Sequence, residues 1–170
     1  SNLTATNGGT VNLYAKWTPV NYSITYNLNG GSISGQKTSY TIETSTFTLP
    51  TPSRTGYLFS GWTGSNGSTP SKSVSISKGS IGDKSYTANW TPKKLTTTFY
   101  RNQNSTDSTT AQQVFTYGVS QSFSAKGWSK TGYTQLGWAD SRTATTQQYS
   151  TLSGVSDGWV ESKYPSNNVY

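Results

Sequence analysis

The chain has 170 residues, of which 30% are apolar, and it carries a formal net charge of +7 at neutral pH. It contains no cysteine and no histidine, which excludes disulfides, thiolate metal sites and the side chain most often used as a general base. Six Trp, twelve Tyr and five Phe residues recur at set places, so the polar composition predicts small aromatic cores rather than disorder.

The first predicted strand consists of Leu13, Tyr14, Ala15, Lys16 and Trp17. Apolar and polar residues then alternate over residues 22–28, which is the pattern of a half-buried strand, and Asn29-Gly30-Gly31 predicts a turn. Shorter strands are predicted at residues 39–42, 47–49, 57–62, 74–76 and 86–90. No segment has convincing helical periodicity, and the best candidates are a short turn before Pro50 and residues 158–163.

Two pairs of matching segments show that the chain repeats itself. Residues 54–62, RTGYLFSGW, match residues 130–138, KTGYTQLGW, and residues 13–19, LYAKWTP, match residues 86–92, YTANWTP. Because the two matches are independent and have nearly the same offset, they indicate tandem units. We therefore predict a closing-strand tail of a preceding repeat at residues 1–18, a complete module at 19–91, and a second, divergent module at 92–170 that lacks its final strand.

Three motifs together suggest a family: the (Arg/Lys)-Thr-Gly-Tyr-x-x-x-Gly-Trp block, an early Asn-Gly-Gly, and the closing Leu-Tyr-Ala-Lys-Trp. In this combination they resemble the Listeria-Bacteroides repeat family, whose members include the B-repeat of internalin proteins. The second unit departs from the pattern, with Phe99-Tyr100-Arg101-Asn102 where the first has Asn-Gly-Gly. The resemblance implies tandem β-grasp-like modules in a secreted or wall-attached bacterial protein, and it implies no catalytic residues.

The repeated aromatic residues have two interpretations. They could stack on sugar rings, but a residue that recurs in every small unit is more simply explained by the core that each unit needs. We therefore assign five aromatic residues to the structural core: Tyr57, Trp62, Trp90, Tyr133 and Trp138.

The sequence contains few residues suited to catalysis or to metal binding. Its six carboxylates are unmatched between the units, whereas glycoside hydrolysis needs a facing pair. No calcium-loop spacing is present. The basic residues are scattered, with Lys93-Lys94 the one adjacent pair, so we expect no nucleic-acid partner and interpret the charge mainly as surface solubility. We predict no enzymatic activity, no cofactor and no metal site.

We expect the chain to act as a structural spacer or stalk of an extracellular bacterial surface, cell-wall or filament-forming protein, with neighbouring repeats or other copies as its partners. The alternative is an adhesive module that binds a host glycan or protein receptor weakly and gains strength by avidity. Clustering of Tyr22, Tyr40, Tyr117 or Trp159 on one solvent face would favour adhesion, and their packing would favour the spacer. No apolar run is long enough for membrane insertion or a signal peptide, and without an initiator Met the sequence is interpreted as a piece of a longer protein.

The predicted ends of the chain complement each other. When Val169-Tyr170 is aligned with Val11-Asn12, the strand expected after Tyr170 is the one found at residues 13–17. A vacant strand position would expose backbone donors and acceptors. We therefore predict that Leu13 to Trp17 of one copy inserts into the second unit of the next, giving a head-to-tail contact that does not close. In a longer repetitive chain, the same contact would be the covalent continuation.

Overall fold

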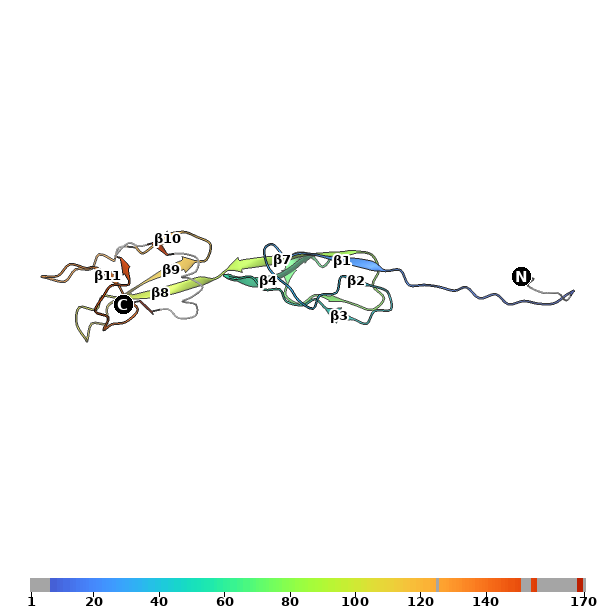
Figure 1. Cartoon of the computed structure of the whole chain (residues 1–170), viewed down its shortest axis with the longest axis horizontal. Coiled ribbons are helices and arrows are strands. Elements are labelled where there is room, and N and C mark those ends of the chain that lie inside the picture. Colours follow the sequence, from blue (N-terminus) through green and yellow to red (C-terminus); the bar gives the residue numbers. More distant parts are fainter. Residues whose placement is uncertain (1–6, 125, 151–153, 156–167, 170) are drawn as a thin grey trace.

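The computed structural model describes residues 7–124, 126–150, 154–155 and 168–169. All regular elements within these residues are β-strands, which confirms the mainly-β fold class. They form two units that lie end to end, preceded by an extended segment (Figure 1). The turn expected before Pro50 is a hydrogen-bonded turn over residues 41–44 rather than a helix, and the candidate at 158–163 lies outside the described residues.

The first unit is a mixed sheet with a small β-pair beside it. Its strands are β1 (Tyr22–Asn27), β2 (Ser39–Tyr40), β3 (Phe47–Thr48), β4 (Tyr57–Gly64), β5 (Gly67–Ser71), β6 (Ser75–Ile76) and β7 (Lys84–Pro92). The sheet has the order β2-β1-β7-β4-β5, and β3 pairs with β6. β1 and β7 are parallel, so the chain between them must cross over rather than turn back. The other pairs are antiparallel.

The core of the first unit is aromatic, as the composition requires. Along β1, Ile24 is buried while Ser23 and Thr25 are exposed, so the predicted alternation sets which face of the strand meets the core. Trp62 lies at the centre, with no exposed surface, and packs edge-to-face against neighbouring rings. The other buried members of this cluster are Ile24, Tyr40, Leu49, Val74, Ile76, Tyr86 and Ala88.

The second unit repeats the strand pairing of the first. Its strands are β8 (Lys94–Tyr100), β9 (Thr110–Thr116), β10 (Gln121–Ser122), β11 (Gly137–Trp138), β12 (Tyr149–Ser150), β13 (Gly154–Val155) and β14 (Asn168–Val169). The pairs β8·β9, β10·β13 and β11·β12 are antiparallel and β8·β14 is parallel, as are their counterparts β1·β2, β3·β6, β4·β5 and β1·β7. A separate core surrounds Phe99, Phe115, Phe123 and Trp138.

β14 corrects the expectation that the second unit lacks its final strand. Phe99 lies opposite Val169 in β14. Its counterpart in the first unit, Tyr26, lies opposite Tyr86 in β7. Val169 therefore occupies the position that Tyr86 has in the first unit. Because residues 13–19 match residues 86–92, Val169 is also the counterpart of Leu13. The closing strand of the second unit thus begins at β14, before the last residue of the sequence. The predicted alignment of Val169 with Val11 was two residues out of register, because Val169 corresponds to Leu13.

The segment before the first unit is extended and exposed. Residues 13–17 belong to no strand that the structure describes, and Trp17 keeps 90% of its surface exposed. Because Val169 already occupies the place of Leu13 on β8, a donated strand in this observed register would overlap β14. Insertion of residues 13–17 into another copy stays a prediction. In the observed register, the inserted strand would compete with β14 for pairing with β8.

Candidate functional site

The two units meet at a joint one residue long. β7 ends at Pro92 and β8 begins at Lys94, and the two strands continue one another along the long axis (Figure 1). The Lys93 N–H donates a hydrogen bond to the carbonyl of Gly56 at 2.9 Å, and the Lys93 carbonyl accepts one from the Tyr117 N–H at 2.9 Å. Lys93 thereby connects a loop of the first unit, loop 54–57, to a turn of the second.

Aromatic packing reinforces this joint. The rings of Tyr57 and Tyr117 meet edge-to-face with centroids 5.4 Å apart, and such a pair contributes about 0.5–1.5 kcal/mol beyond its buried area. The Arg54 guanidinium carbon lies 3.9 Å from the centre of the Tyr57 ring on the same loop. Gly56 has φ +77°, and a side chain there would overlap the Tyr117 ring. Loop 54–57 therefore fits Tyr117 closely.

The five predicted core aromatics have different environments. Trp62 and Trp138 are buried at 0% and 2% exposure in the two cores. Trp90 is half-buried and donates its indole N–H to the Leu28 carbonyl at 2.9 Å. Tyr57 packs at the joint rather than in the core cluster. The assignment of Tyr133 to the core is wrong, because it is 71% exposed on the turn that its N–H closes with the Lys130 carbonyl.

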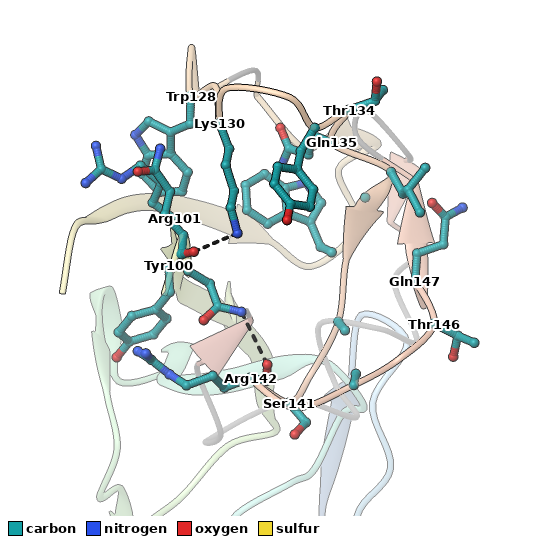
Figure 2. A pocket seen from close by; sticks show the side chains of 18 of the residues that line it. Tyr100, Arg101, Trp128, Lys130, Thr134, Gln135, Ser141, Arg142, Thr146 and Gln147 are labelled. Carbon is teal, nitrogen blue, oxygen red and sulfur yellow. Dashed lines mark hydrogen bonds between the residues drawn. The ribbon is translucent and has the colours of Figure 1, made fainter. Parts of the chain in front are cut away.

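A pocket of about 410 Å³ lies in the second unit (Figure 2). Its walls come from the end of β8, from residues 128–139 and from residues 141–147. Trp128 and Tyr133 contribute aromatic surface, and Arg101 and Lys130 contribute cationic donors. Apolar ring faces beside a few polar groups suit a small polar ligand such as a sugar.

Hydrogen bonds hold one wall of the pocket in place. The Arg101 guanidinium donates to both carboxylate oxygens of Asp107, at 3.0 and 3.2 Å, and the backbone N–H groups of Gln103 and Thr109 donate to the same carboxylate. The guanidinium first, and the backbone donors after it, hold the pKa of the Asp107 carboxyl well below its usual range. Lys130 Nζ donates to the Gln103 carbonyl at 2.7 Å, which joins this wall to the aromatic loop (Figure 2).

The described lining of the pocket offers amide, hydroxyl and cationic donors beside aromatic rings, which are groups that can bind a ligand. Its described lining contains no carboxylate, whereas a glycosidase needs two. Within the described residues, no group of three or more His, Cys, Asp or Glu side chains could hold a metal ion. The same residues contain no helix that is long and apolar enough to cross a membrane.

Comparison with known families bears on these observations. Residues 22–100, slightly less than half of the chain, match the family model of the Listeria-Bacteroides repeat domain. This segment is a Listeria-Bacteroides repeat domain. The match confirms the resemblance and runs from β1 through β8. Listeria-Bacteroides repeats are typical of bacterial surface proteins and are not an enzymatic family. Searches of curated proteins and of solved structures gave no match.

Sequence reasoning missed the residues that form the joint. The repeated Gly-Tyr was interpreted as core, yet Tyr57 lies where the first unit meets the second. Tyr117 gave no signal through repetition, because the residue at its place in the first unit is Ile42. The available signal was the absence of a linker between Pro92 and Lys94, since units joined by one residue must touch.

Proposed function

We propose that this chain is a spacer segment of an extracellular bacterial surface protein, in which repeats set reach by joining end to end at a stiff joint. The joint at Lys93 is the observation that carries the proposal. A flexible linker would consist of several Gly or Ser residues without contacts to either unit. Here one residue makes backbone hydrogen bonds to both sides, and an aromatic pair packs across the junction.

The packing of tyrosines supports a spacer over an adhesive face. Tyr40 is buried, Tyr22 packs against the core of the first unit, and Tyr117 packs against the core of the second and against the joint. These tyrosines therefore do not form an exposed aromatic patch. Trp159, the fourth residue of this comparison, lies outside the described residues.

Small-angle scattering of the full chain tests the spacer. We expect an elongated particle, and we expect Tyr117→Ala to broaden its distance distribution because the joint loses its ring pair. Tyr133→Ala is the matched control, since that exposed tyrosine lies outside the joint, and all curves are extrapolated to infinite dilution so that only the shape of the single chain is compared. A folded-back wild-type particle, or equal scattering changes in both variants, would contradict a stiff joint.

The pocket of the second unit supports a second candidate, an adhesive module with a weak sugar site multiplied by avidity. NMR titration with neutral and acidic oligosaccharides tests it: shifts at Trp128 and Tyr133 that Trp128→Ala abolishes would support adhesion. Absence of shifts at millimolar sugar would remove this candidate and leave the spacer untouched.

A further inference from the structure

The loop at residues 130–133 has the same conformation as loop 54–57. In each loop the tyrosine N–H donates to the carbonyl of the basic residue three positions earlier, at 3.1 Å in loop 54–57 and 3.0 Å in loop 130–133. The basic group lies over the tyrosine ring, 3.9 Å from its centre for Arg54 and 4.3 Å for Lys130. The glycine between them has φ +77° in one loop and +78° in the other. Loop 130–133 thus has the shape that holds the next unit at the joint.

The two loops differ in what covers them. At Gly56, an added side chain would overlap the Tyr117 ring, whereas at Gly132 it would meet nothing within 4 Å. Tyr57 packs against Tyr117, whereas Tyr133 is largely exposed. As far as the described part of the chain shows, loop 130–133 is therefore the same surface without its cover.

The first unit carries the counterpart of the covering element. The turn at residues 116–119 closes with a 3.2 Å hydrogen bond, and the turn at residues 41–44 closes in the same way at 3.1 Å. The strand registers place Ile42 at the position of Tyr117 and Val20 at that of Lys93. Val20 is 60% exposed and Ile42 is 43% exposed. An apolar covering element is therefore exposed on the first unit.

We propose that loop 130–133 is a docking site for the first unit of a second copy of this chain. Val20 and Ile42 of that copy take the places on Gly132 and Tyr133 that Lys93 and Tyr117 take on loop 54–57. The occupant is fixed by the joint itself, because the same loop shape is already covered by the same kind of turn within the chain. This inference goes beyond the spacer function, which needs only the internal joint.

Charge agrees with this placement. Glu43 follows Ile42 and corresponds to Gly118, where a side chain would lie 3.2 Å from the Tyr57 hydroxyl. In the docked pair, the Glu43 carboxylate therefore approaches Tyr133. The Lys130 ammonium group lies over the ring of Tyr133, so the two opposite charges come near each other. The contact joins two different surfaces, so it propagates head to tail and does not close.

Sedimentation equilibrium of the full chain tests the proposal. At the internal joint the two surfaces are covalently linked, which keeps them at a high effective concentration, whereas two separate copies have no such link. For a contact this small between separate copies, we expect a dissociation constant on the order of 0.1–1 mM. The measurement therefore spans about 10 μM to about 5 mM, which brackets that constant. We expect the mean mass to rise with concentration and to pass that of a dimer without a plateau.

Two variants remove the two halves of the contact separately. Ile42→Glu places a charge on the exposed turn, and Gly132→Asn fills the open loop with a residue that tolerates positive φ, as Asn29 and Asn102 do in this chain. We expect each to weaken self-association at least about tenfold. Val114→Glu, at a residue of similar exposure on β9, is the matched control and should associate as the wild type does. Unchanged thermal unfolding verifies that each variant folds.

Mixing the two variants gives the decisive result. Ile42→Glu keeps an intact loop 130–133, and Gly132→Asn keeps an intact turn at residues 41–44. One copy of each variant can therefore form a single contact, so the equimolar mixture should form dimers and nothing larger. A wild type that stays monomeric throughout, a mixture that stays monomeric, or variants that associate like the wild type would each overturn the proposal. Loss of association in Trp17→Ala, with both docking variants unaffected, would instead assign the contact to the strand at residues 13–17.

Discussion

Replacing Gly56 with Ala tests whether the joint fits as closely as the structure shows. An L-residue at φ +77° costs about 1–2 kcal/mol, because its Cβ crowds the backbone. The new methyl group would also overlap the Tyr117 ring, and overpacking of this kind costs about 1–3 kcal/mol. Tyr117 relieves the overlap by leaving Tyr57, which forfeits their edge-to-face contact. We therefore expect a total loss of about 2–5 kcal/mol.

Gly132→Ala is the matched control for this measurement. It has the same backbone geometry, φ +78°, but its added methyl group meets nothing within 4 Å, so only the backbone term of about 1–2 kcal/mol remains. Urea unfolding of both full-length variants, followed residue by residue by NMR so that each unit reports separately, gives the difference. Equal losses in the two variants would refute the close fit between loop 54–57 and Tyr117.

Three further predictions concern the cores, the joint and acid stability. Trp62→Ala should cost about 3–5 kcal/mol in urea unfolding and Trp17→Ala less than about 0.5 kcal/mol, because one indole is buried and the other exposed; similar losses would contradict this assignment. A double-mutant cycle on Tyr57 and Tyr117 should give a coupling of about 0.5–1.5 kcal/mol, and a coupling of zero would show that the rings do not interact. The lowered pKa of Asp107 contributes stability above its unfolded pKa of about 3.9, and that contribution is lost as pH falls below it. Asp107→Asn should flatten the fall in urea midpoint of the second unit between about pH 5 and pH 2, and an unchanged slope would contradict it.

Periodicity and turn chemistry predicted the first unit well. Alternation over residues 22–28 predicted β1 with its buried Ile24. The motif ending in Trp62 predicted β4, because an aromatic core residue and its flanking strand must occur together in so small a unit. The order of the strands in the sheet could not be predicted from the sequence. The parallel pairing of β1 and β7 depends on a long crossover connection, which no local sequence pattern indicates.

The joint and the pocket were harder to predict because both depend on contacts between distant segments. Tyr133 repeats Tyr57 in sequence and in backbone conformation, yet one is exposed and the other packed. What differs is whether another unit covers the loop, and repetition within the chain carries no information about that. The pocket likewise combines the end of β8 with residues more than two dozen positions later, through hydrogen bonds such as that from Lys130 to Gln103.

The parallel arrangement of β1 and β7 has a mechanical consequence. A tether that pulls the first unit from both sides acts on the start of β1 and on the end of β7, in opposite directions along neighbouring parallel strands. The load therefore shears their hydrogen bonds together, at the four register pairs from Ile24–Lys84 to Asn27–Thr87, instead of peeling them apart one at a time. We expect single-molecule stretching to reach a higher force along this axis than when the unit is held at Tyr22 and Lys84, a geometry that unzips the same pair. A segment that bears tension in this way would keep its length under drag.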